Sequence, residues 1–149
     1  MIKLFSKYKF LFYLCNFILI ILYLYPGSIL GWFFYKDTSL QPQITPNLLI
    51  ISSNHVYAFL ILSFVGFFTY KKNDQFRSLS IYLIFLSTIL EILHYFIPER
   101  SFEFPDLFGN LAGVIIVIII FYFFKKNENF KDKLFINFSY FYFRLFFSS

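Results

Sequence analysis

Four long apolar stretches alternate with short polar segments along this chain. They cover residues 10–25, 50–70, 79–97 and 107–124, and the second begins somewhere between positions 48 and 55. Each stretch is close to the roughly 17–25 residues that a helix needs to cross a bilayer. The pattern predicts an all-α fold, a polytopic membrane protein in which residues 1–126 form a bundle of four transmembrane helices.

Lysine and arginine are distributed unevenly among the segments that separate these stretches. Of the 13 basic residues, only Lys36 and Arg100 lie in the loops 28–53 and 98–106. Cytoplasmic loops retain an excess of Lys and Arg, so this distribution predicts a multi-pass membrane protein with both termini in the cytoplasm. The net charge of +5 then reflects topology. We therefore expect the lipid bilayer as a partner and no nucleic acid.

The segments outside the apolar stretches carry further expectations. No small-x-small cleavage site follows residues 10–25, so we expect an uncleaved signal anchor. Aromatic residues around Trp32 predict a piece of the loop that lies at the membrane interface. Residues 127–149 form a cytoplasmic basic and aromatic tail, either a helix on the membrane surface or a disordered end. From Lys133 onward the tail carries five polar residues at helical spacings of three and four: Lys133, Asn137, Tyr140, Arg144 and Ser148.

Composition limits what single residue types can indicate. The chain has 26 Phe and 12 Tyr, a bias typical of AT-rich codons, so aromatic residues are weak evidence for an aromatic site. Cys15 is the only cysteine, which excludes an intramolecular disulfide and a cysteine-based metal site. Because Cys15 lies in an apolar run, we expect it to contribute to packing.

The polar residues within and beside the stretches gather at one depth, near the predicted outer ends of the helices. Glu91 and His94 are three residues apart and therefore share a helix face. Ionisable groups inside a membrane are costly, so their clustering at one depth predicts a shared, outward-facing polar pocket. The candidate functional residues are His55, Glu91, His94, Arg100, Asp106 and Asn110.

Several residues near this pocket also have a structural interpretation. Asp106 follows Pro105 and would stabilise the start of the fourth helix as a cap. Gly109 and Gly113 form a small-xxx-small pair, which is typical of a helix-packing face. His55 could equally be a hydrogen-bonded histidine at the membrane interface.

Glu91 is the residue that most needs a functional explanation. A carboxylate at that depth must be paired, protonated or near water, and we expect a contact with Arg100, direct or through His94 or water. Four residues could ligate a divalent metal: Glu91, His94, His55 and Asp106. A single Glu-x-x-His pair is common by chance, so no metal and no cofactor is assigned. The pair could instead act as acid and base on a substrate reached from outside.

The spacing of these residues resembles that of the VanZ-like membrane proteins. The family's core pattern has a Glu, a Gln three residues later, Pro-x-Arg, an Asp six residues after the Arg, an Asn four further on and a Gly three beyond. The corresponding residues here are Glu91, His94, Pro98, Arg100, Asp106, Asn110 and Gly113. The segment from His55 to Phe59 resembles the family's His followed four residues later by Tyr. The resemblance covers residues 52–124.

The chain departs from the family pattern at several positions. Ile51 and Ser52 stand where the family has Asp-Lys, and His94 stands in place of the Gln. Val117 replaces a later glycine. The resemblance implies a bacterial cytoplasmic-membrane protein from a family linked to resistance to glycopeptide antibiotics such as teicoplanin.

The leading functional hypothesis is a VanZ-like envelope protein whose outer pocket binds or modifies an anionic envelope component, including a lipid-linked one. A membrane-embedded enzyme that uses Glu91 and His94 as acid and base is the first alternative. The others are a small transporter or proton-relay subunit and a structural partner of another membrane protein. A proton relay would need ionisable groups through the full depth of the membrane. The stretches 10–25, 50–70 and 107–124 lack such groups in the halves nearer the cytoplasm.

Overall fold

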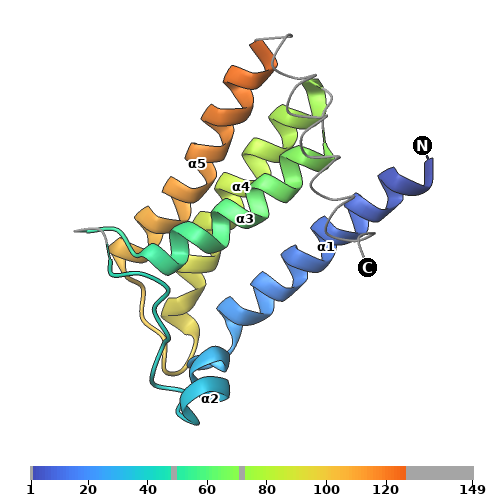
Figure 1. The fold of residues 1–149 in the computed structure, drawn as a ribbon. Coiled ribbons are helices and arrows are strands. Elements are labelled where there is room, and N and C mark those ends of the chain that lie inside the picture. Colours follow the sequence, from blue (N-terminus) through green and yellow to red (C-terminus); the bar gives the residue numbers. More distant parts are fainter. Residues whose placement is uncertain (1, 48–49, 71–72, 127–149) are drawn as a thin grey trace. The chain divides into compact units, whose positions relative to one another are not determined.

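The computed structural model describes residues 2–47, 50–70 and 73–126, and within them the chain forms helices joined by loops (Figure 1). The elements in chain order are α1 (Ile2–Leu24), α2 (Ile29–Tyr35), α3 (Ser53–Thr69), α4 (Asn73–Leu93), the short 3-10 helix η1 (His94–Phe96) and α5 (Phe104–Lys126). The prediction of an all-α fold is confirmed for this part of the chain.

Three helical segments are long and apolar enough to cross a membrane: α1, α4 continued by η1, and α5. The helix α3 is also apolar but has only 17 residues. At 1.5 Å per residue, α3 is about 25 Å long, against a hydrocarbon core of about 30 Å. The helix lengths therefore indicate a membrane protein with three candidate spans, where the sequence predicted four.

The third apolar stretch, predicted to be helical over residues 79–97, ends earlier than expected. The α-helical turns of α4 stop at Leu93, and the chain then tightens into η1. Ile97 is extended (φ −100°, ψ 129°), because the residue before a proline, here Pro98, is sterically driven out of the helical region. As a result Glu91 lies in the last turn of α4.

The chain forms two compact units, residues 1–117 and 118–149. In the first unit α1 packs against α3 and α4, and α3 also packs against α4, which runs alongside it in Figure 1. The helix α3 contributes three almost fully buried apolar side chains, Phe59, Leu62 and Phe67. The described part of the second unit is the end of α5. The tail of residues 127–149 lies outside the described residues, so both interpretations of it stay predictions.

The helix α5 meets α3 at two glycines. A Cβ atom at Gly109 would lie 2.6 Å from the carbonyl oxygen of Ser52, and one at Gly113 would lie 2.5 Å from the carbonyl oxygen of Val56. Both neighbouring atoms belong to the backbone, so no change of rotamer could relieve the overlap. The absence of side chains at these two positions allows the close approach of the helices.

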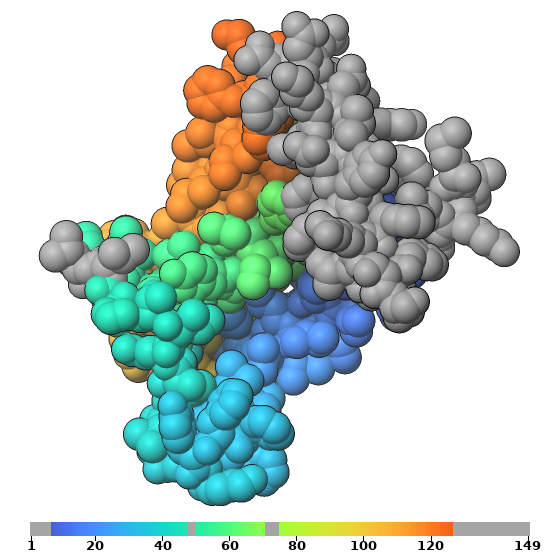
Figure 2. Space-filling view, viewed as in Figure 1, coloured from blue at the N-terminus to red at the C-terminus, as the bar shows by residue number. Residues whose placement is uncertain are grey.

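The helix α2 presents an exposed aromatic surface, coloured light blue in Figure 2. The Oγ atom of Ser28 caps this helix by accepting a hydrogen bond from the N–H group of Gly31 at 2.9 Å. More than half of each aromatic side chain is exposed: Trp32, Phe33, Phe34 and Tyr35. Aromatic side chains of this kind are typical of the membrane–water interface, which is where the sequence predicted the segment around Trp32.

The chain leaves α2 through a tight turn that satisfies its own polar groups. Lys36 adopts a left-handed conformation (φ 58°), and its N–H group donates to the carbonyl oxygen of Trp32 at 2.9 Å. The carboxylate of Asp37 accepts hydrogen bonds from the backbone N–H and the hydroxyl of Ser39, at 2.8 and 2.7 Å. These two bonds favour the ionised form and hold the pKa of Asp37 below its ordinary value.

Candidate functional site

Four segments of the first unit bring polar side chains to one place. The residues are His55 in the first turn of α3, Glu91 in the last turn of α4, His94 in η1, and Asp106 and Asn110 in the first two turns of α5. Four of them are at most 5 % exposed, and the side chain of Asp106 is 21 % exposed. We call these five residues the polar cluster. The structure thus brings together five of the six residues that the sequence singled out.

Asn110 links the members of the polar cluster. Its Nδ2 atom donates to the carbonyl oxygen of Ser87 at 3.2 Å and to Oε2 of Glu91 at 3.5 Å. Its Oδ1 atom accepts a hydrogen bond of 2.6 Å from the hydroxyl of Tyr23 and lies 3.0 Å from Nδ1 of His55. Because Nδ2 faces two acceptors, the orientation of the amide is determined by its surroundings.

His55 forms a pair with Asp106. Its Nδ1 atom carries a proton, because it faces Oδ1 of Asn110, which can only accept. Its Nε2 atom lies 3.3 Å from Oδ2 of Asp106. The two side chains are therefore within ion-pair distance of each other.

A second histidine–carboxylate pair has the same form. The Nε2 atom of His94 lies 3.1 Å from the carbonyl oxygen of Tyr23 and must donate to it. Its Nδ1 atom lies 3.4 Å from Oε1 of Glu91, which is three residues earlier in the chain. The same carboxylate oxygen accepts a hydrogen bond of 3.0 Å from the N–H group of Glu103.

Arg100 lies beside the polar cluster but does not pair with Glu91. Its guanidinium group donates to the carbonyl oxygens of Leu22 at 3.0 Å and Tyr25 at 3.3 Å. These carbonyls lie at the C-terminal end of α1, where the last turn of a helix leaves acceptors without intrahelical donors. A direct Glu91–Arg100 ion pair is absent among the described residues, and that form of the sequence expectation is wrong. The histidines and backbone groups lie nearer to the carboxylate.

Tyr23 is a central residue of the site that the sequence did not single out. It is 7 % exposed, and its hydroxyl lies 3.1 Å from Nδ1 of His55. Its ring stacks on that of His94 at 5.6 Å and meets that of His55 edge-on at 5.2 Å. Because the chain has 12 tyrosines, the sequence alone gave no reason to single out Tyr23. The available signal was its position near the C-terminal end of the first apolar stretch, which is the end predicted to lie at the depth of the other cluster residues.

A cavity of about 410 Å³ adjoins the polar cluster. Its polar wall includes the side chains of Tyr23, Asn54, His55, His94 and Arg100. Its apolar wall includes Leu22, Ile29, Leu30, Phe34 and Ile61. Glu91 and Asp106 are not part of the wall, but each carboxylate lies within 3.4 Å of a histidine that is. Among the described residues that line this cavity, Arg100 carries the permanent charge and none is acidic.

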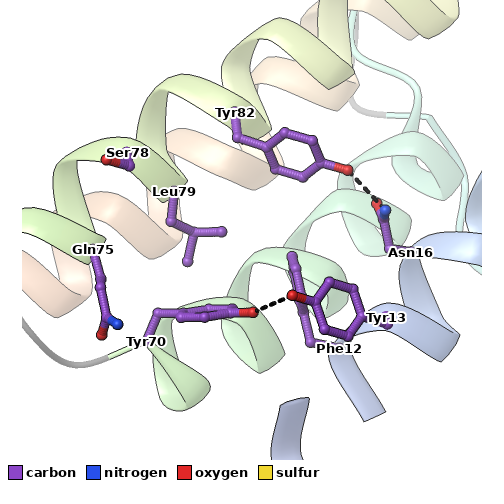
Figure 3. A pocket seen from close by; sticks show the side chains of 8 residues that line it. All are labelled: Phe12, Tyr13, Asn16, Tyr70, Gln75, Ser78, Leu79 and Tyr82. Atoms are coloured by element: carbon purple, nitrogen blue, oxygen red, sulfur yellow. Dashed lines mark hydrogen bonds between the residues drawn. The ribbon is translucent and has the colours of Figure 1, made fainter. Parts of the chain in front are cut away.

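A second hollow, of about 490 Å³, lies near the opposite end of α3 and beside the start of α4. Figure 3 shows two hydrogen bonds on its wall, from Asn16 to the hydroxyl of Tyr82 at 2.7 Å and between the hydroxyls of Tyr70 and Tyr13 at 3.0 Å. Its described lining consists of apolar and uncharged polar side chains. The two histidines and Arg100 therefore line the first cavity and not this hollow.

Comparison of the chain with models of known protein families, with curated protein sequences and with solved structures gives no match. The geometry of the polar cluster and its cavity, together with the residue spacing, is therefore the basis for the functional proposal.

Proposed function

We propose that this chain is a VanZ-like protein of the bacterial cytoplasmic membrane whose outward-facing pocket binds an anionic, lipid-linked component of the cell envelope. The cavity beside the polar cluster supports this proposal, because it combines one permanent positive charge, on Arg100, with a wall of apolar side chains. A ligand that suits both has an anionic head group and a hydrocarbon tail. The resemblance to the family links this function to glycopeptide resistance.

The proposal includes four spans: the three long helical segments and, in addition, α3. A chain that crossed the membrane three times would place Lys125 and Lys126 on the opposite side from Lys7 and Lys9, against the tendency of basic residues to stay in the cytoplasm. A helix somewhat shorter than the hydrocarbon core is accommodated by local thinning of the bilayer at modest cost. The helix α3 is also the one most enclosed by its neighbours, so its lipid contact is small.

Thiol labelling tests this topology. In a Cys15→Ser background, cysteines introduced by Ser39→Cys and Ser101→Cys are expected to react with a membrane-impermeant thiol reagent in intact cells. The cysteine of Asn73→Cys is expected to react only after the cells are opened, because the proposal places that position in the cytoplasm. Labelling of Asn73→Cys alone in intact cells would reverse the orientation. Labelling of Ser39→Cys and not Ser101→Cys would contradict four spans.

Ligand binding tests the pocket. Full-length protein in lipid nanodiscs is expected to bind a long-chain isoprenyl phosphate at least ten-fold more tightly than the matching isoprenol. Arg100→Gln should weaken phosphate binding by about ten- to hundred-fold, because a hydrogen-bonded charge contributes about 1.5–3 kcal/mol. Isoprenol binding should change little. The measurement is a titration of the nanodiscs with each lipid.

The matched control is Lys36→Gln, which removes the basic residue of the other outer loop. Lys36 lies 4.7 Å from the ring of Trp32 and does not line the cavity, so its loss should leave phosphate binding within two-fold. A melting curve of each variant checks that the end of α1 stays folded without the bonds from Arg100. Equal affinity of the native protein for phosphate and isoprenol would contradict the proposal.

A membrane-embedded acid–base enzyme is the second candidate. The observation that favours it is that His55 and His94 both line the cavity and each has a carboxylate within 3.4 Å. A histidine oriented by a carboxylate is a common arrangement for proton transfer. His94→Gln distinguishes lipid binding from acid–base catalysis in the same experiment. It introduces the glutamine of the VanZ-like pattern and removes the imidazole that would transfer the proton. Chemical conversion of the bound phosphate by the native protein, lost in His94→Gln, would favour the enzyme.

A further inference from the structure

Three helices place one imidazole and two carboxylates around a common point. One donor atom from each of His55, Glu91 and Asp106 lies within 4.8 Å of the other two. The three residues are 36 and 15 positions apart in the sequence, so only the packing of α3, α4 and α5 brings them together. Metal ligands meet in this way when helices contribute inward-facing side chains to a shared centre.

The orientation of His55 suits a metal ligand. Its Nδ1–H group is held by Oδ1 of Asn110 at 3.0 Å, and that amide is in turn held by Ser87 and Glu91. In metal sites the second ring nitrogen is held in this manner by an acceptor, which directs the first nitrogen at the ion. The free Nε2 atom lies 3.3 Å from Oδ2 of Asp106, close to the spacing of about 3.3 Å expected for two ligands at 2.0 Å on a tetrahedral ion.

The two carboxylates of the polar cluster also favour a bound cation. Glu91 is fully buried, and among the described residues no lysine or arginine lies within ion-pair distance of it or of Asp106. The ion-pair partners of both carboxylates are histidines, which are charged only when protonated. A divalent ion would neutralise the two carboxylates together and leave His55 neutral, as a ligand must be.

We propose that His55, Glu91 and Asp106 bind one divalent transition-metal ion, with Zn²⁺ preferred. An imidazole together with two carboxylates suits the first-row transition metals, whereas Mg²⁺ prefers oxygen ligands and keeps most of its water. Three protein ligands leave a coordination position open, as in catalytic zinc sites. The site is independent of the proposed lipid ligand: it depends on His55 and on two carboxylates that do not line the cavity, and it holds whether or not an anion binds there.

Metal titration of the untagged, full-length protein tests this site. The protein in nanodiscs is first freed of metal with a chelator and then titrated with Zn²⁺. After removal of the excess ion, elemental analysis is expected to find one Zn²⁺ per chain. Asp106→Asn keeps the shape of the side chain and removes one anionic ligand, so it should weaken Zn²⁺ binding by at least about a hundred-fold. Co²⁺ in the native protein should show the intense visible bands of a tetrahedral site.

The matched control is Asp37→Asn, the same substitution at an exposed carboxylate that bonds only within its own turn. This control should bind Zn²⁺ within two-fold of the native protein, as should Cys15→Ser, which removes the one thiol of the chain. Zinc retained equally by Asp106→Asn, or no stoichiometric zinc in the native protein, would overturn the proposal. If Asp106→Asn does not fold, the Co²⁺ spectrum of the native protein decides: octahedral bands, or none, would overturn it as well.

Discussion

Asn110→Leu is expected to lower the free energy of unfolding by about 3 kcal/mol, one of the largest losses available to a single substitution in this chain. Leucine has a similar volume but cannot form hydrogen bonds. The change would remove the acceptor of the Tyr23 hydroxyl and the amide donor to a carboxylate oxygen of Glu91, while Nδ1 of His55 would keep the Tyr23 hydroxyl at 3.1 Å as a partner. Each unsatisfied buried group costs about 1 kcal/mol or more. Unfolding in mixed micelles, followed by circular dichroism, measures the loss.

The matched control is Asn16→Leu, a change of the same kind on α1. Asn16 donates one hydrogen bond, to the hydroxyl of exposed Tyr82, and its own Oδ1 atom is buried without a hydrogen-bond partner. Its replacement should change stability by less than about 0.6 kcal/mol, since a single hydrogen bond between membrane helices is worth about that much. Equal effects of the two substitutions would mean that the polar cluster contributes no more than an ordinary interhelical contact.

Gly113→Ala is expected to destabilise the protein by about 2 kcal/mol, although it adds only one methyl group. The added Cβ atom would lie 2.5 Å from the carbonyl oxygen of Val56 and 2.8 Å from the backbone nitrogen of Leu60. Because both atoms belong to the backbone of α3, the two helices would have to move apart. The same unfolding experiment in mixed micelles measures the effect.

Ile116→Ala on the same helix provides the comparison for this glycine. Ile116 is 41 % exposed, so its truncation should cost well below 1 kcal/mol in a lipid environment, where the side chain is not taken out of water in either state. If Gly113→Ala were as stable as the native protein, the close approach of α5 to α3 would not be a constraint on the fold.

The apolar pattern determined the class of this protein and the approximate positions of its long helices. Stretches near twenty residues with few charges can satisfy their backbone groups in a membrane only as helices, so length and hydropathy suffice for that conclusion. The pattern also predicted five residues that the structure brings together, because helical periodicity puts Glu91 near His94 and Asp106 near Asn110. Their common depth followed from their distances to the expected helix ends.

The pairing of these residues across helices required the tertiary structure. Two glycines on α5 determine how closely Asn110 and Asp106 approach His55, and no periodicity within one helix contains that information. The part played by Tyr23 and the true partners of Arg100 depend on how the end of α1 meets η1 and the loop that follows it. The proposed metal ligands also come from three different helices. The spacing of one Glu-x-x-His pair could therefore not identify them. Sequence spacing determines which side chains share a face, whereas contacts between distant segments decide what that face meets.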